Sequence, residues 1–436
     1  MLPLNVQLPD EPFAFSLQAL AERFQTIKDL RRPRGVRYPL PVVLTVAVLA
    51  KLAGHGRLRA VAEWARLRSG QLCDLLGFGR CTLPHPTTWS RIFGTAVDPC
   101  ELDKAVSGFF KELCLCSARI QKKRRRRGGL VIAIDGKTLR GTIPLGQTQG
   151  VHLVCAYLPQ AGVVLAQVEV QEKANELTVA PTLLAQLDLH GAVVTGDAMF
   201  AQRNLSVQVV EGGGDYLWKV KDNQPQLLED IRLLFDPPPA SKTEASLFPL
   251  PADLQWASST NKGHGRVEER QVWVSSLLKG YSDWPYLEQV FKLKCRMEDR
   301  LGQIRETVHY GVTSLPCTTA SPHRLLQVVR EHWGIENGLH HRRDVSLDED
   351  HSQVRLGGAP RVLATLNSVV VGLVVHHARC ATDSDANLPA AQRAFHYRLD
   401  RALWSYQYRH GHPHTHSRHR PHYLRLVPTQ SVAGAA

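Results

Sequence analysis

The hydrophobic pattern of the first third of the chain is helical. Apolar residues recur at spacings of three and four in Val42–Leu52, Leu58–Leu67 and Leu102–Leu113, and no long alternating run interrupts them. This spacing gathers apolar side chains on one face of each helix. We therefore predict a helical N-terminal domain over residues 1–120.

One segment of this domain has the composition of a helix start. Pro86, Thr87 and Thr88 precede Trp89 and Arg91, so a threonine cap could open a short helix that carries a basic residue. Two interpretations stay open, a helix-turn-helix that reads DNA and an ordinary helical hairpin, and the hairpin is the commoner one. We expect the N-terminal domain to bind DNA.

The pattern changes after residue 129. Leu130–Ile134, Val151–Tyr157 and Val163–Val170 are rich in β-branched and aromatic residues and are bounded by glycine and proline, as strands are. Helix, strand, helix and strand then follow at Leu177–Leu187, Ala192–Thr195, Gln202–Val210 and Asp215–Val220. Three strands followed by this alternation predict an α/β fold with an RNase H-like mixed sheet, in which acidic residues gather at one edge.

The predicted RNase H-like core is interrupted once. Its first part is residues 130–235, and residues 236–310 contain further strand-like segments around glycine and proline turns, which we interpret as a β-rich insertion. The second part, residues 311–380, begins with a helix over Pro322–Arg343. The apolar stretch Val362–His376 is predicted to pack behind that helix.

The charge of the chain favours a polyanionic partner. Its 436 residues include 53 Lys and Arg against 40 Asp and Glu, a net charge of +13. Six basic residues follow one another in a linker at residues 121–129, and DNA contact is predicted there against the alternative of a solvated segment. They are Lys122, Lys123, Arg124, Arg125, Arg126 and Arg127. The His- and Arg-rich tail, residues 381–436, is predicted to be partly disordered.

Cysteine usage and hydropathy indicate the compartment. The nine cysteines form no C-x-x-C pair and follow no secretory leader, which suits reduced thiols in a cytosol. The most apolar window, Leu40–Ala53, is too short to span a bilayer and contains Lys51. We expect a cytoplasmic protein without a membrane partner.

Two aspartates end predicted strands of the core. Asp135 follows the apolar run Val131–Ile134, and Asp197 follows Ala192–Gly196. A single aspartate in this position is usually a turn former or a helix cap. Two at neighbouring strand ends repel each other unless a cation lies between them, and Mg²⁺ favours oxygen ligands. The pair therefore predicts a metal site.

The third acid is predicted to be Glu336, on the helix that opens the second part of the core. Helical spacing places His332, Trp333, His340 and Arg343 on the same face, so carboxylate, cation and aromatic ring point together.

Three alternatives to this choice remain. His332, Glu336 and His340, at i, i+4 and i+8, could form a helix-borne metal site of another type. Asp344 and Glu349 are also acids near the end of the helix.

The motifs of the chain resemble a known family. In order, they are RYPLPVVLTVAVLAKLAG with AEW, IAIDGKTLRG, KANE, VTGDAM, GGGDYLWKVKDNQ, GHGRVEER, and REHWGIENGLH with DEDHSQVR. Over roughly residues 30–380 the chain is similar to DDE transposases of the H-repeat-associated, ISAs-type insertion-sequence family. The resemblance implies that Asp135, Asp197 and Glu336 are its three catalytic, metal-binding acids. It also implies a prokaryotic, nucleoid-associated enzyme.

Such a triad uses two Mg²⁺ ions, for which Mn²⁺ can substitute. One ion activates a water or a 3′-hydroxyl, and the other, roughly 3.5–4 Å away, stabilises the leaving oxygen. The same site can therefore cleave transposon ends and then join them to target DNA. A catalytically decayed DNA-binding relic and an RNase H-like host nuclease are the alternative functions.

The implied partner is double-stranded DNA, both the terminal inverted repeats and the target, with a homodimer as the expected synaptic assembly. Phosphate contacts are expected beside the acids, against the alternative of solvated surface charge. The residues assigned to them are Lys219, Lys221, Asn223, Arg330, His332 and Arg343, together with His264 and Arg266 of the GHGRVEER motif.

Overall fold

The computed structural model describes residues 17–76, 82–115, 122, 126–171, 175–236, 251–263, 265–381 and 387–397. Lys123, Arg124, Arg125 and His264 lie outside the described residues, and so does most of the predicted tail.

The N-terminal region is helical, as predicted. Its helices are α1 (Leu17–Gln25), α2 (Leu40–Leu52), α3 (Leu58–Leu67), α4 (Ser69–Leu76), α5 (Pro86–Thr95) and α6 (Pro99–Leu115), with a 3-10 turn, η1, at Pro33–Gly35. The cap of α5 differs from the expected threonine. The His85 side chain accepts the backbone N–H of Thr87, and Pro86 occupies the first turn, where its missing N–H costs nothing.

One mixed sheet of nine strands organises the rest of the chain, in the order β3-β2-β1-β4-β5-β9-β8-β7-β6. Strands β1 (Leu130–Thr138), β2 (His152–Leu158) and β3 (Val163–Val170) are antiparallel, whereas β4 (Ala192–Gly196) and β5 (Asp215–Val220) run parallel to β1. This confirms the predicted RNase H-like arrangement.

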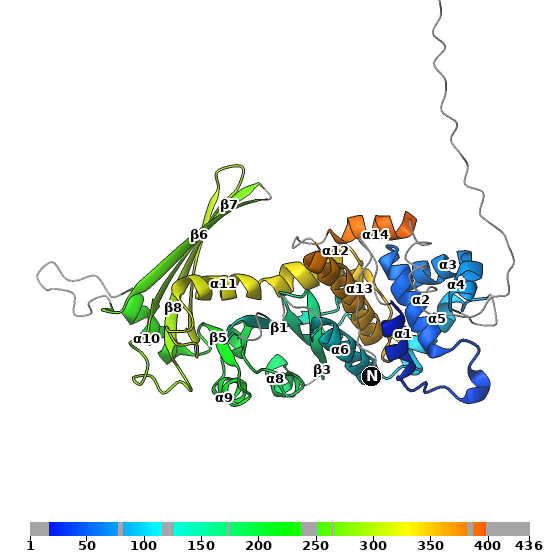
Figure 1. Ribbon diagram of the computed structural model, residues 1–436, viewed down its shortest axis with the longest axis horizontal. Helices are drawn as coiled ribbons and strands as arrows, with labels where there is room; N and C mark the ends of the chain where they lie inside the picture. The colour runs from blue at the N-terminus through cyan, green and yellow to red at the C-terminus, as the bar shows by residue number, and fades with distance from the viewer. Residues whose placement is uncertain are drawn as a thin grey trace, which may run out of the picture.

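The strands of the predicted insertion extend this sheet and do not form a second one. Strand β9 (Ile304–Thr313) pairs antiparallel with β5, and β8 (Gln289–Glu298), β7 (Arg266–Ser275) and β6 (Gln255–Gly263) follow outward. Figure 1 shows these strands projecting from one end of the molecule, with the N-terminal helices at the other end.

Helices and short turns complete the core. Between the strands lie η2 (Arg140–Thr142), α8 (Glu176–Leu184), η3 (Ala198–Phe200), α9 (Arg203–Glu211) and α10 (Pro225–Phe235). After the sheet come α11 (Pro322–His332), a π-helical turn (Glu336–His340), α12 (His341–Val345), η5 (Glu349–His351), α13 (Ala359–Ala381) and α14 (Leu388–Tyr397).

Helix α13 joins the two halves of the molecule. It contacts α2, α5 and α6 as well as β3, and Val369, Val370 and Val371 are fully buried. Its window Ala359–His376 is long and apolar enough to cross a membrane, but 94% of that window is buried inside the protein. The apolarity of α13 is therefore that of a core helix.

The segment between α12 and α13 is pressed closely against its surroundings. A Cβ on Gly56 would lie 2.2 Å from the Leu347 carbonyl oxygen, and one on Gly141 would lie 2.3 Å from that of Ser352. Only glycine permits backbones to approach this closely. The segment thereby fixes the end of the α11–α12 helix against both the N-terminal helices and the sheet.

Candidate active site

Strands β1 and β4 bring the two predicted aspartates to one edge of the sheet. The parallel register pairs Ala133 with Thr195, so Asp135 and Asp197 each lie two residues further along neighbouring strands. The Asp135 side chain is 26% exposed. Burial, followed by the nearby carboxylates of Glu176, Glu336 and Asp197, raises the pKa of Asp135 to about 7, although the Gly136 N–H opposes this shift.

Asp197 forms an ion pair with a lysine of the neighbouring strand. The Lys219 ammonium on β5 lies 2.9 Å from Asp197 Oδ1 and also lies over the Trp333 ring, 5.7 Å from its centroid. Burial acts to raise the pKa of Asp197, but the attraction to Lys219 outweighs it, and the net pKa is lowered. The Asn223 amide donates to the Ala198 carbonyl over 2.7 Å and so holds the turn that follows Asp197.

The helix that carries Glu336 crosses the strands in order. His332 Nδ1 lies 3.1 Å from Thr195 Oγ1 on β4, and His340 Nδ1 lies 3.5 Å from Asp135 Oδ2 on β1. Glu336 lies one turn after the first contact and one turn before the second, and it is exposed. Glu336 therefore lies on the helix between the residue that contacts β4 and the residue that contacts β1.

The helix is less regular than predicted. The predicted helix over Pro322–Arg343 has one turn residue, Trp333, whose φ and ψ stay helical, and it continues through a π-helical turn at Glu336–His340 into α12. A π turn inserts an extra residue into the helix and is frequent at functional sites. The assumed α-helical face therefore does not continue to Arg343.

Arg343 cannot hold phosphates as predicted. Its side chain is fully buried, and its Nε lies 2.9 Å from Glu349 Oε2. His332 is also buried, and burial followed by the Lys219 charge lowers its pKa to about 4. A neutral buried histidine is no phosphate-binding cation, so both assignments are corrected.

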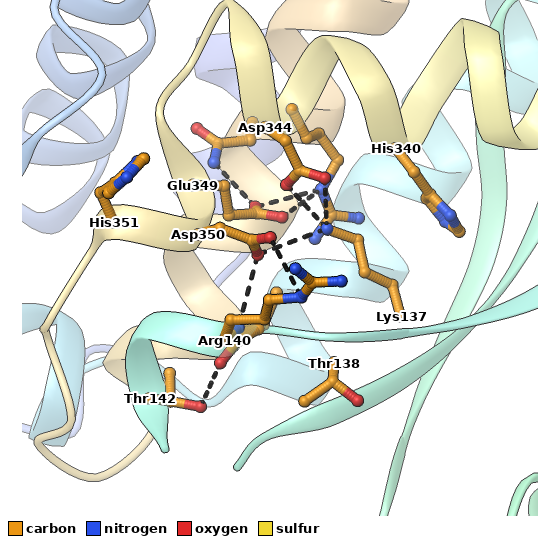
Figure 2. Close-up of polar contacts among 12 residues, drawn as sticks. Lys137, Thr138, Arg140, Thr142, His340, Asp344, Glu349, Asp350 and His351 are labelled. Atoms are coloured by element: carbon orange, nitrogen blue, oxygen red, sulfur yellow. Dashed lines mark hydrogen bonds and ion pairs between the residues drawn. The ribbon is translucent and has the colours of Figure 1, made fainter. Parts of the chain in front are cut away.

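The two competing acids near the end of the helix are held by internal cations. Lys137, two residues after Asp135, lies 2.7 Å from the Asp344 carboxylate and 3.4 Å from that of Asp350. Glu349 binds Arg343 and also accepts the Asn367 amide over 2.8 Å. Figure 2 shows this network, with His340 standing apart from it. These pairings favour Glu336 over Asp344 and Glu349.

Two residues of the site were missed by the sequence reasoning, Glu176 and His152. Glu176 Oε1 lies 2.8 Å from His152 Nε2, and Glu176 is the carboxylate that raises the pKa of Asp135 most. The KANE motif was the available signal, but it pointed only to the start of a helix.

The donor set fits a hard divalent cation. Carboxylates that repel one another in a partly buried site are stabilised when a cation lies between them, and oxygen donors suit Mg²⁺ or Mn²⁺. Within the described ranges, no three His, Cys, Asp or Glu side chains converge as a metal site. The Lys219 ammonium supplies the positive charge at Asp197.

The basic residues predicted to contact DNA divide into two groups. Lys122, Arg126, Lys221 and Arg330 are exposed. Arg127 and Arg266 are also exposed, but each is paired with an acid. Arg127 binds Asp215 through two hydrogen bonds of 2.9 and 2.8 Å, and Arg266 is paired with Glu268.

A cationic pocket lies next to Asp197. Its volume is about 370 Å³, and Lys219, Lys221, Arg232 and His309 are among its lining residues. Lys219 belongs both to this pocket and to the acid site, so a bound anion would lie beside the carboxylates.

The sequence of the chain matches two protein-family models. Residues 126–358, more than half of the chain, match the family model described as the transposase DDE domain, and residues 21–110 match the model described as DDE_Tnp_1-associated. Domains of this family generally use divalent metal ions.

Three curated relatives come from Escherichia coli. "Putative transposase YncI" of strain O157:H7 is 27% identical over 82% of this chain and 88% of its own length. "H repeat-associated putative transposase YhhI" of strain K12 is 26% identical over 83% and 91%. "H repeat-associated putative transposase YbfD" of strain K12 is 34% identical over 58% and 92%.

Among solved structures, the piggyBac transposase synaptic complex with hairpin DNA is similar at a TM-score of 0.36 and 10% identity, over 93% of this chain and 79% of that one. A likeness this distant says nothing about the site. The match to the family model and the relatives of similar length, YncI and YhhI, confirm the resemblance read from the motifs, and this chain belongs to the transposase DDE domain family.

Proposed function

We propose that the protein cleaves DNA at the ends of an insertion sequence and transfers those ends into target DNA. Asp135, Asp197 and Glu336 are the catalytic acids and hold two Mg²⁺ ions, for which Mn²⁺ can substitute. The observation that carries the proposal is the position of Glu336, on a helix whose flanking turns contact the strands of both aspartates.

The bound ions would activate the attacking oxygen and stabilise the leaving one. The protein supplies the orientation. The contact between His340 and Asp135 fixes the first carboxylate, and the Asn223 amide fixes the turn after the second. His340 is kept neutral, because burial, then the Arg343 and Lys137 charges, lowers its pKa well below the ordinary value. A neutral imidazole does not compete with a cation for Asp135.

The pocket at Lys219, Lys221 and Arg232 is the proposed path of the DNA backbone. Three cations line a cavity that shares Lys219 with the acid site, so a strand bound there would enter beside Asp197. The exposed Arg126 and Arg330 are the further proposed phosphate contacts. Two copies of the chain would hold two transposon ends in one synaptic complex, in a prokaryotic cytoplasm at the nucleoid.

The test uses the full chain, DNA that carries the terminal inverted repeats, and a supercoiled target plasmid. With Mg²⁺ we expect nicks at the repeat ends and joined products, and with EDTA neither. Asp135→Asn, Asp197→Asn and Glu336→Gln should each abolish both products while leaving the gel shift on the repeat DNA intact. Glu211→Gln, at an exposed acid on α9, is the matched control and should behave as the unaltered protein.

The alternative functions give different outcomes. A gel shift without metal-dependent cleavage by the unaltered protein identifies a DNA-binding relic. Cleavage without preference for the repeats and without joining identifies a nuclease. Cleavage that persists in Asp135→Asn contradicts the assignment of the triad.

A further inference from the structure

Glu176 occupies the first position of α8, and local interactions fix it there. The Asn175 side chain caps the helix by accepting the Thr178 N–H over 3.2 Å. This cap sets where the helix begins and therefore where the Glu176 side chain leaves it. Helix α8 packs against β2 and β3, which brings its first turn to the end of the β1–β2 pair.

One oxygen of Glu176 contacts His152, and the His152 ring is positioned by a second contact on its other nitrogen. His152 Nε2 lies 2.8 Å from Glu176 Oε1, and His152 Nδ1 lies 2.7 Å from Thr138 Oγ1. His152 and Thr138 are direct partners in the β1–β2 register. Figure 2 shows the Thr138 side chain pointing away from Lys137, so Glu176 approaches β1 from the face opposite to α12.

The approach of Glu176 to β1 depends on a glycine. A Cβ on Gly136 would lie 2.2 Å from Glu176 Oε1 and 2.7 Å from His152 Nε2, so any side chain there would displace the carboxylate. Gly136 directly follows Asp135. The Glu176 carboxylate therefore lies against the residue that follows the first proposed catalytic acid.

The second oxygen of Glu176 has no hydrogen-bond partner. Oε2 is fully buried without one, while the side chain as a whole is 17% exposed. A buried carboxylate oxygen without a donor is costly. A contact with His152 alone requires only one oxygen of Glu176. It does not explain why the second oxygen is buried without a hydrogen-bond donor.

The edge of β1 that faces β4 is unpaired at its end. Strand β4 pairs with β1 only over Leu130–Ala133 and ends at Gly196, whereas β1 continues to Thr138. At such a notch, carboxylates from both faces of the sheet can approach one ion.

We propose that Glu176 is a fourth carboxylate of the catalytic site and contributes its Oε2 to the divalent ion held by Asp135. This inference rests on the proposed function, because it assumes that Asp135 binds a metal ion. It makes Glu176, the last residue of the KANE motif, part of the catalytic machinery, with Gly136 required for access and His152 as the positioning residue.

The experiment measures metal binding and not turnover. Mn²⁺ is titrated into the full chain without DNA, and the free ion is followed by electron paramagnetic resonance. We expect Glu176→Gln, which keeps the size of the side chain and a partner for His152, to weaken Mn²⁺ binding about tenfold or more. Glu176→Asp should bind more tightly than Glu176→Gln, and Glu211→Gln should match the unaltered protein.

Thermal unfolding separates a ligand from a merely structural residue. If Glu176 is a ligand, Glu176→Gln relieves repulsion in EDTA and keeps or raises the melting temperature, while the increase produced by Mn²⁺ shrinks. If it is structural, the melting temperature falls equally with and without Mn²⁺, and the inference is overturned.

The binding data also separate the two proposals. Tight Mn²⁺ binding by Glu176→Gln, together with its loss in Asp135→Asn, overturns the role of Glu176 alone. Absence of Mn²⁺ binding by the unaltered protein overturns both this inference and the proposed metal-dependent function.

Discussion

Two acid-rich clusters lie along the same helix and balance their charges differently. In the network of Figure 2, Asp344 and Asp350 share Lys137, and Glu349 binds Arg343. In the neighbouring cluster of proposed catalytic acids, the ion pair of Asp197 with Lys219 is the one lysine or arginine contact to its acids within the part of the chain described. The acids of the first cluster are neutralised by internal bases, whereas the acids of the second would be neutralised by the cation of the proposed function.

The two clusters are joined through β1. Asp135 and Lys137 point to the same face of the strand, and they contact His340 and Asp344, which are four residues apart on the helix. Strand β1 and the helix therefore share two contacts: one at the proposed catalytic acid Asp135 and one in the ion-pair network of Lys137. Mutations in the two clusters should separate activity from stability.

The largest effect is expected at Asp135. Asp135→Asn keeps the size of the side chain but removes the charge, so cleavage of repeat DNA in Mg²⁺ should fall at least about a thousandfold. Stability in EDTA should not fall, because the substitution also removes repulsion from Glu176 and Glu336. Cleavage rates and melting temperatures measure the two quantities. A variant that loses stability and activity together would contradict the distinction between the clusters.

The converse effect is expected at Arg343. Arg343→Met leaves the buried Glu349 carboxylate without its guanidinium, and breaking a buried pair from one side costs about 3–5 kcal/mol. Urea unfolding gives the free energy. Lys279→Met, which breaks the more exposed pair with Glu288, is the control and should cost at most about 1 kcal/mol. Equal losses in the two variants would show that burial does not distinguish these pairs.

The pH dependence of stability tests the crowding of carboxylates around Asp135. The folded-state pKa of Asp135, about 7, lies above its ordinary 3.8, so folding favours the protonated form. The stability from this group is present at low pH and is lost as pH rises through 7. In EDTA the melting temperature should therefore be higher at pH 6 than at pH 8, and Mn²⁺ should raise it more at pH 8. Asp135→Asn should show a smaller difference, and an unchanged difference would contradict the assignment.

The smallest effect is expected in the pocket beside Asp197. Lys221 is exposed and contacts the phosphate backbone in the proposed function, so Lys221→Ala should weaken binding to all DNA sequences alike, by a few-fold. The slope of log affinity against log salt should become shallower by about 1. Lys279→Ala, at a lysine outside this pocket, is the control. A change in sequence preference in place of a uniform loss would indicate base contact at Lys221.

Local patterns predicted much of the fold and site. The strand-end aspartates follow apolar runs, and a parallel sheet edge brings such positions together without further information. Glu176 could not be recognised in this way, because its role depends on the missing side chain at Gly136 and on the packing of a distant helix. The sequence shows that residue 176 is an acid, but it does not show which side chains the carboxylate contacts.

The error at Arg343 has a similar cause. Charged residues on a helix are usually exposed, and the assumed helical period placed Arg343 beside Glu336. The π turn shifts that period, and the chain then reverses through Asp348, whose φ of 56° is left-handed, so that Glu349 meets Arg343. Neither the π turn nor the reversal has a signal in the hydrophobic pattern.

The position of α13 has a consequence for the order of events during synthesis. Lys51 on α2 donates to Asn367 on α13 over 2.7 Å, across 316 residues of sequence, and α13 completes the core of the N-terminal helices. Those helices emerge from the ribosome first but cannot finish packing until nearly the whole chain has followed. A product that stops before α13 lacks a finished core even when all three acids are present. The core of the N-terminal helices is therefore completed only after the proposed catalytic residues have been made.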